Sequence, residues 1–131
     1  MAKTKAHTAY KLKDGTRVKG VTTILNNLGW NKNILVAWAR RTALAGDDPD
    51  AVLKEAGAIG TLAHYLCECD IKGEKADTED YSAEQIEKAE NAFLGYLEWK
   101  KMTKPKYEAI ELKMVSEKYK VGGTADFIAR I

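Results

Sequence analysis

Cysteine, histidine and long apolar runs are scarce in this chain, and their scarcity excludes several classes of protein. Cys67 and Cys69 are the two cysteines of the sequence. They lie two residues apart in a segment predicted to be helical, so their side chains diverge and cannot bond to each other. No apolar run reaches the ~18 residues of a membrane span, and the first residues lack the apolar stretch of a signal peptide. We therefore predict reduced thiols, a cytoplasmic location and no membrane association.

The shortage of histidine also limits the metal sites that the sequence can build. His64 precedes Cys67 by three residues and Cys69 by five, a grouping that suggests zinc. No second pair of ligands follows at the spacing of a zinc site. The sequence therefore argues against zinc.

Charges of opposite sign are segregated along the chain, although the formal net charge is only +2. Residues 1–19 carry six Lys/Arg and one acid, and residues 100–120 carry seven lysines and three acids, whereas residues 46–98 carry fourteen acids and four lysines. If the basic ends meet in the fold, they form a surface suited to a phosphate backbone. Two solvated faces of an ordinary globular protein explain the same pattern equally well.

The hydrophobic pattern predicts a single α+β domain over residues 1–131, in which 45% hydrophobic residues suffice for one core. It has an N-terminal hairpin, a helical middle and a C-terminal antiparallel hairpin. The N-terminal hairpin turns at Asp14-Gly15. The expected elements are the hairpin 10–19, a two-turn helix within the stretch 20–29, helices 32–44, 49–72 and 83–101, and the strands 106–116 and 119–131.

Capping residues support the helix boundaries. Thr22 is expected to cap the first helix, and Asn31 or Asn33 the second. Asp48 followed by Pro49 opens the third helix, and Gly73 ends it. Ser82 to Gln85 forms a capping box for the fourth. The second helix is predicted to bury one face, which consists of Ile34, Leu35, Trp38 and Ala45.

One stripe of the third helix carries Gly57, Gly60 and His64 at i, i+3 and i+7. Each glycine inside a helix costs about 1 kcal/mol relative to alanine, so a compensating role is expected. The glycines would leave a shallow groove for a ligand, with His64 at its end as a neutral imidazole ligand. Close helix packing, with His64 at the margin of a core, is the alternative.

The final hairpin carries a second group of polar residues. A two-residue turn at Glu117-Lys118 would pair Ser116 with Tyr119, which makes Glu111 and Asp126 diagonal neighbours on one face, with α-carbons roughly 7–8 Å apart. Both carboxylates could then approach one divalent cation, and Lys113 would lie on the same face. Asp126 stands in an otherwise apolar strand, so it is either a ligand or an exposed edge residue. An exposed sheet face with ordinary alternating charges is the alternative.

Five short motifs occur in order along the chain. They are Val21-Thr22-Thr23-Ile24-Leu25, Leu35-Val36-Ala37-Trp38-Ala39, Gly60-Thr61-Leu62-Ala63-His64, Glu111-Leu112-Lys113-Met114-Val115-Ser116 and Gly122-Gly123-Thr124-Ala125-Asp126. Over nearly the whole chain this order resembles that of the RecB-like, phage-type exonucleases of the PD-(D/E)xK nuclease superfamily. The resemblance implies an incomplete restriction-endonuclease-like core and metal-dependent hydrolysis of DNA phosphodiester bonds.

The resemblance also implies roles for individual residues. His64, Asp126 and Glu111 become metal ligands for Mg²⁺ or Mn²⁺, and Asp126 and Glu111 become catalytic acids. In relatives, a following strand carries an acid-x-lysine motif, whereas only five residues follow Asp126 here. We therefore expect the chain to be the N-terminal portion of a nuclease domain with little or no activity alone, unless Glu111-x-Lys113 substitutes for the motif.

DNA is the expected partner, and one cluster of residues is suited to it. A basic run with an aromatic side chain can hold phosphates and stack a base, and Lys100, Lys101, Lys104, Lys106 and Tyr107 form such a run. Two other functions remain open. One is a non-catalytic DNA- or protein-binding module on a nuclease-derived scaffold. The other is self-association, in which the unpaired strand 119–131 adds to the sheet of another chain.

Overall fold

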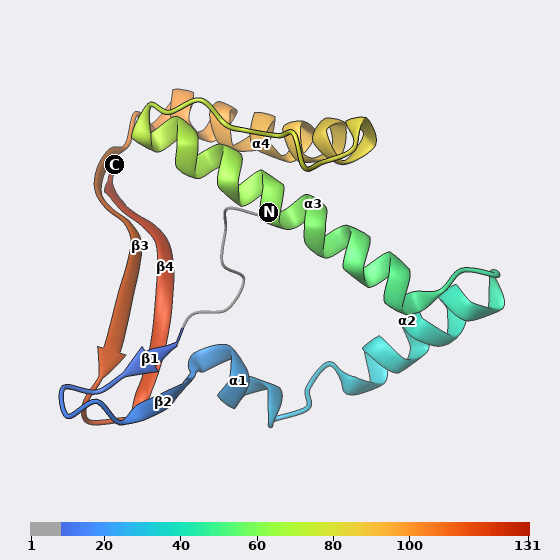
Figure 1. Cartoon of the computed structure of the whole chain (residues 1–131), viewed down its shortest axis with the longest axis horizontal. Helices are drawn as coiled ribbons and strands as arrows, with labels where there is room; N and C mark the ends of the chain where they lie inside the picture. Colours follow the sequence, from blue (N-terminus) through green and yellow to red (C-terminus); the bar gives the residue numbers. More distant parts are fainter. Residues whose placement is uncertain (1–8) are drawn as a thin grey trace. The chain divides into compact units, whose positions relative to one another are not determined.

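The computed structural model describes residues 9–131 and has an α+β fold, as predicted (Figure 1). Lys3 and Lys5 of the basic N-terminal stretch lie outside the described residues. Strands lie at both ends of the described chain and four helices lie between them. A four-stranded mixed sheet has the order β1-β2-β4-β3, in which β1 and β2 are antiparallel and β2 and β4 are parallel.

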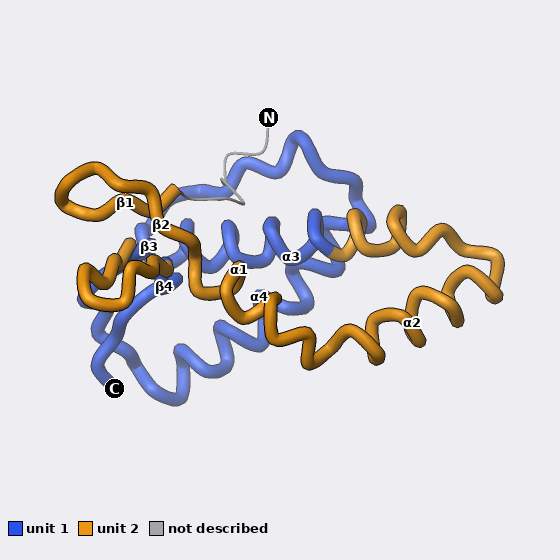
Figure 2. Tube along the Cα trace, turned by 90° about the horizontal axis from the view of Figure 1, so that it is seen from below, with its two compact units in different colours: residues 1–8, 57–112, 124–131 blue, residues 9–56, 113–123 orange. Residues whose placement is uncertain are grey.

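The chain divides into two compact units, and each is described by itself (Figure 2). Unit 1 contains residues 57–112 and 124–131, and unit 2 contains residues 9–56 and 113–123. The boundaries fall inside helix α3 (Pro49–Lys72) and strands β3 (Lys106–Ser116) and β4 (Val121–Arg130). Leu62, Cys69 and Ala89 are buried in unit 1, and Leu12 is buried in unit 2.

Unit 2 contains the predicted N-terminal hairpin, formed by β1 (Tyr10–Lys11) and β2 (Arg17–Gly20). Gly15 adopts a φ of 86°, which a glycine tolerates in a tight turn. The Asp14 carboxylate accepts a hydrogen bond from the Thr16 backbone N–H at 2.8 Å. This bond lowers the pKa of Asp14, so the turn keeps its charged acceptor into mildly acidic solution.

A glycine allows β2 and β4 to pair next to an aromatic ring. Gly20 faces Gly122 in the parallel register. A Cβ atom added at Gly122 would lie 2.6 Å from Cδ1 of Tyr10, closer than two carbon atoms can approach. Only glycine therefore fits at position 122. At the neighbouring Gly123, an added Cβ atom would lie 3.8 Å from Cγ2 of Val21, which is an ordinary contact distance.

Two helices of unit 2 form where the sequence predicts them, but their details differ. Helix α1 (Val21–Asn26) begins directly after Gly20, so Thr22 lies inside the first turn and its assignment as the cap is wrong. Helix α2 (Lys32–Leu44) has the predicted bounds, with Asn31 at the capping position but without a side-chain capping bond. The predicted buried face of α2 is also wrong, because the side chains of Ile34 and Leu35 are 69% and 55% exposed.

The remaining helices begin and end much as their capping residues indicate. Helix α3 starts at Pro49, and the Asp48 carboxylate accepts a hydrogen bond from the Asp50 N–H at 3.1 Å. Gly73 follows the helix with a φ of 70°. Helix α4 (Ala83–Thr103) carries the predicted capping box, in which both Ser82–Gln85 bonds form. It extends two residues beyond the predicted end.

The final hairpin has a longer turn than the sequence suggested. Strand β3 ends at Ser116 and β4 begins at Val121, so four residues, 117–120, make the turn. The Lys120 N–H donates to the Ser116 carbonyl oxygen at 2.9 Å. The predicted pairing of Ser116 with Tyr119 is therefore wrong, and the register counted from it, with Glu111 opposite Thr124, loses its basis.

No described helix combines the length and the apolar character that crossing a bilayer requires.

Candidate functional site

An aromatic cluster in unit 1 determines which way the side chains of β4 point. The ring of Phe127 lies 5.7 Å from that of Trp99 on α4 and 5.5 Å from that of Tyr107 on β3, the second contact being edge-on. Such contacts add about 0.5–1.5 kcal/mol beyond the burial of the rings. Because successive side chains of a strand point to opposite faces, Asp126 must point away from this cluster.

Helix α3 places His64 next to that aspartate. His64 Nδ1 lies 3.6 Å from Asp126 Oδ1, although the residues are far apart in sequence. Their side chains are 67% and 63% exposed, so solvent and solutes reach both. Asp126 is thus an exposed residue beside an imidazole, and the structure brings together the two residues that the sequence analysis singled out.

Glu111 on β3 belongs to the same electrostatic environment. Its pKa is raised, first by loss of hydration and then by the negative charges of Glu68 and Asp126, and His64 and Lys72 oppose the rise. Its backbone φ is 50°, a left-handed conformation that a residue with a side chain rarely adopts within a strand. Strain and like-charge repulsion therefore coincide at Glu111.

The sequence patterns did not identify two charged residues of this environment, Glu68 and Lys72. Glu68 lies four residues after His64, and Lys72 four residues after Glu68, so all three share one stripe of α3. Glu68 and Lys72 form an ion pair, which raises the pKa of Lys72. The i, i+4 spacing from His64 was the signal that could have identified Glu68.

The glycines of this stripe are not packing sites. A Cβ atom added at Gly57 or Gly60 would meet nothing within 4 Å. Close helix packing therefore does not explain them within the described residues. Among residues 9–131, nothing covers α3 at these two glycines.

A thiol also lies near the pair. The pKa of Cys67 is raised by burial and by the negative charges of Asp70 and Asp126. Cys67 is therefore a protonated, weakly nucleophilic thiol at neutral pH. Its pKa depends on the charge of Asp126, but Cys67 is not one of the candidate metal ligands.

The fit of these residues to a divalent cation is partial. Two ligands that are each about 2.1 Å from one ion lie about 3–4 Å apart, and the His64–Asp126 separation of 3.6 Å falls in that range. Imidazole with carboxylates suits Mn²⁺ as well as Mg²⁺. Within residues 9–131, however, no group of three or more His, Cys, Asp and Glu side chains is arranged to hold a metal ion. Two side chains of ligand type lie at ligand-to-ligand distance, and a metal site here would need a third to move.

The predicted nucleic-acid residues fall into two groups. Lys100 donates to Asp70 at 2.6 Å, and Tyr96 donates to the same carboxylate oxygen at 2.9 Å. The hydroxyl groups of Tyr96 and Tyr107 are 2.6 Å apart. These bonds join α3, α4 and β3, so Lys100 and Tyr107 have structural partners within unit 1.

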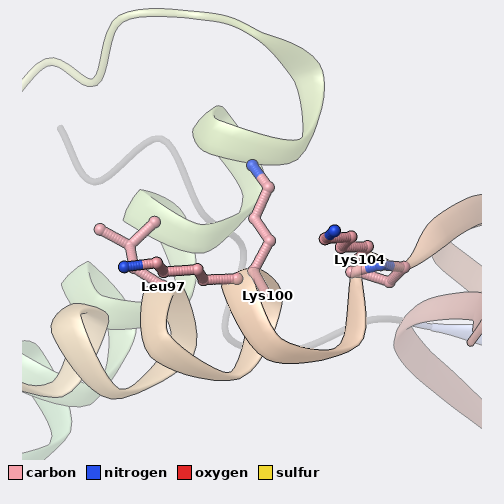
Figure 3. Close-up of a pocket in the computed structure, with 5 residues that line it drawn as sticks. Leu97, Lys100 and Lys104 are labelled. Carbon is pink, nitrogen blue, oxygen red and sulfur yellow. The ribbon is translucent and has the colours of Figure 1, made fainter.

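The other lysines lie nearer to solvent. Leu97, Lys100, Lys101, Lys104 and Pro105 line an open pocket of about 470 Å³ at the end of α4. In Figure 3, Lys100 extends away from α4 toward α3, whereas Lys104 lies at the end of its own helix. Lys104 adopts a left-handed conformation with a φ of 48° and forms the C-terminal cap of α4. Lys106 is exposed at the start of β3.

Comparison with known proteins adds no assignment, since no family model, no curated protein and no solved structure matches this chain.

Proposed function

We propose that His64, Asp126 and Glu111 hold a Mg²⁺ or Mn²⁺ ion and that this site serves a deoxyribonuclease of the RecB-like, PD-(D/E)xK type. The observation that carries the proposal is the 3.6 Å approach of His64 Nδ1 to Asp126 Oδ1 on an open surface. The resemblance of the ordered motifs to that family supports the proposed reaction class. The strained, electrostatically coupled Glu111 is the third ligand candidate.

The residues of the proposed site would contribute different groups to metal binding. Asp126 offers a carboxylate, and His64 offers a neutral imidazole nitrogen. Glu111 must lose its proton before it can bind a cation, and its raised pKa makes that loss harder than for an ordinary glutamate. A bound divalent ion would neutralise phosphate charge and make a coordinated water more acidic. Lys72, held by Glu68, supplies a positive charge on the same helix stripe.

Lys101 and Lys104 are the better candidates for contact with the DNA backbone. Lys100 lines the same pocket, but its ammonium group is bound to Asp70. We therefore expect Lys101→Gln to weaken DNA binding and to lower the slope of log affinity against log salt by about 1. Lys100→Gln should instead lower the stability of the fold. Titrations at several salt concentrations, with a thermal melt of each variant, separate the two effects.

Calorimetric titration with Mn²⁺ tests the metal site. The intact chain should bind Mn²⁺, and His64→Ala or Asp126→Asn should each weaken binding by more than the ~10-fold typical of losing an outer-shell partner. Asp47→Asn removes an exposed aspartate from unit 2 and is the matched control. Equal binding by all four proteins would refute the site.

A nicking assay on plasmid DNA with Mn²⁺ then tests the reaction. Cleavage that both site variants abolish supports a nuclease. Metal binding without cleavage supports instead the non-catalytic module on the same scaffold. The premise of self-association through an unpaired final strand is wrong for the described residues, because β4 lies between β2 and β3 in the sheet. Self-association by another surface stays a prediction, which the mass of the chain in solution tests.

A further inference from the structure

A long segment of unit 2 carries positive charge and no acid. Between Gly15 and Gly46 there are five cations, Arg17, Lys19, Lys32, Arg40 and Arg41, and no Asp or Glu. Helices α1 and α2 both lie in this segment. In a chain with nineteen acids, so long an acid-free stretch is a local field of one sign that attracts anions.

A pocket lies within this segment, where α1 leads into α2. Its volume is about 540 Å³, which falls in the range of roughly 300–1,000 Å³ typical of small-ligand pockets. Its walls combine apolar, amide and cationic side chains, among them Leu25, Asn26, Trp30, Asn31, Lys32 and Leu35. Trp30 is 79% exposed, which leaves its indole available to a ligand.

The turn before α2 folds Lys32 back along the pocket. Gly29 adopts a φ of 65°, and the Lys32 N–H donates to its carbonyl oxygen at 3.1 Å. A Cβ atom added at Gly29 would lie 3.1 Å from Lys32 Cδ, so the stem of the lysine runs over this glycine. An exposed aromatic ring and a cation are thereby held within one turn of each other.

A second pocket lies along α2 and shares no lining residue with the first. Its volume is about 520 Å³, and Asn33, Arg40 and Arg41 contribute polar groups to its lining. Arg40 lies eight residues after Lys32, a distance of about 12 Å along the helix axis. That distance exceeds the separation of neighbouring phosphates, so Lys32 and Arg40 suit phosphates that are not adjacent on one flexible strand.

We propose that α1 and α2 bind a single-stranded nucleic acid, with one base stacked on Trp30, a nearby phosphate on Lys32 and a more distant phosphate of the same strand on Arg40 and Arg41. Asn26 and Asn31 can hydrogen-bond to the edge of the stacked base. The ligand is single-stranded because a base must leave its helix to stack on an indole. An apolar protein partner would also cover Trp30 and Leu35, but it would not account for the absence of acids.

This binding site is separate from the metal-dependent function proposed above. It shares the nucleic-acid ligand, but its residues all belong to unit 2, and it needs no divalent ion. The experiment is therefore run in EDTA, where failure of the metal site has no influence on the result.

The test compares a 12-residue oligothymidylate with an abasic oligonucleotide of the same length. Stacking on Trp30 should quench tryptophan emission in the first case and not in the second. Trp30→Ala should weaken oligothymidylate binding about 5- to 150-fold, and Trp30→Tyr, which keeps an aromatic face, should retain most of the affinity. Trp30→Phe identifies the emission that comes from position 30 rather than from Trp38 or Trp99.

Two further results complete the test. Lys32→Gln should lower the salt slope by about 1, whereas Lys75→Gln, an exposed lysine of unit 1, should leave it unchanged. Equal affinity for the abasic oligonucleotide, or unchanged emission of the wild-type chain on binding, would overturn the proposal. These two measurements use the unaltered protein and remain decisive if Trp30→Ala does not fold.

Discussion

Replacing Tyr96 by phenylalanine should destabilise the protein and change how its stability depends on pH. The Tyr96 hydroxyl group donates to Asp70 Oδ2 at 2.9 Å and lies 2.6 Å from the Tyr107 hydroxyl group. Phenylalanine keeps the ring, which stacks on Phe93 at 5.7 Å, so the substitution removes both hydrogen bonds and little packing.

The size of the effect follows from the partners that remain. A hydrogen bond to a charged group contributes about 1.5–3 kcal/mol, and one between neutral groups contributes about 1 kcal/mol. Asp70 keeps its ion pair with Lys100, and Tyr107 is half-buried, so its hydroxyl group can turn to water. The loss of stability should therefore be smaller than the summed contributions of the two hydrogen bonds. We expect Tyr96→Phe to lower the free energy of unfolding by about 2 kcal/mol at pH 7.

The same contacts predict a loss of stability in alkaline solution. Burial and the bonds to Tyr107 and Asp70 raise the pKa of Tyr96 far above that of a free tyrosine. The folded protein therefore keeps this proton when the unfolded chain releases it. The stabilisation is complete below about pH 10 and is lost as the pH rises further, at up to about 1.4 kcal/mol per pH unit. Phenylalanine has no proton to lose, so the difference between the two proteins should shrink by about 1 kcal/mol by pH 11.

Urea unfolding at pH 7, 9, 10 and 11 measures both effects. Tyr119→Phe is the matched control, because the side chain of Tyr119 is 71% exposed and its substitution should change the free energy of unfolding by less than about 0.5 kcal/mol. A loss below about 0.5 kcal/mol for Tyr96→Phe at pH 7, or a difference that stays constant up to pH 11, would refute the reasoning.

Four more perturbations test other parts of unit 1 and the β2–β4 pairing. Gly60→Ala should stabilise the protein by about 1 kcal/mol, because its Cβ meets open space, whereas Gly122→Ala should destabilise it by about 1–3 kcal/mol through its clash with an aromatic ring; thermal melts compare the pair. Alkylation of Cys67 by iodoacetamide should accelerate at pH 8 when Mn²⁺ or Asp126→Asn removes the neighbouring negative charge, and an unchanged rate by mass spectrometry would contradict this. Glu111→Gln should slightly raise the free energy of unfolding at pH 7 but not at pH 4. The raised pKa of Glu111 means that its ionisation opposes folding, so the wild-type protein loses stability as the pH rises past that pKa, and glutamine removes this loss. Denaturation at both pH values without metal tests the sign of the effect.

Local signals in the sequence predicted most of the secondary structure. The bounds of α2, α3 and β3 agree with the structure. For α3 and β3 the reason is that Pro49, Gly73 and Pro105 mark element ends through their own backbone preferences. The capping box of α4 agrees for the same reason. Such signals depend on a few neighbouring residues, so they can be recognised in the sequence without knowledge of the tertiary structure.

Features that depend on distant neighbours were harder to predict. The spacing of Ile34 and Leu35 indicates an apolar face but not whether anything covers it, and both side chains are exposed. The turn after Ser116 contains a backbone hydrogen bond from Lys120 to Ser116, and no local sequence pattern predicted that bond. His64 and Asp126 were paired only through the order of the motifs, since nothing in the composition connects a helix residue with a strand residue 62 positions later.

The cost of the candidate site to the fold is itself an argument for function. Glu111 holds a backbone conformation that costs of order 1–3 kcal/mol, at a point where the charges of Glu68 and Asp126 oppose its ionisation. The glycine stripe beside His64 weakens α3 without gaining a packing contact in the part of the chain that the structure describes. A sequence optimised for stability alone would remove each of these costs by a single substitution. Their coincidence around one exposed imidazole–carboxylate pair supports the proposed metal site, because a bound ligand would supply a compensating interaction that the fold does not.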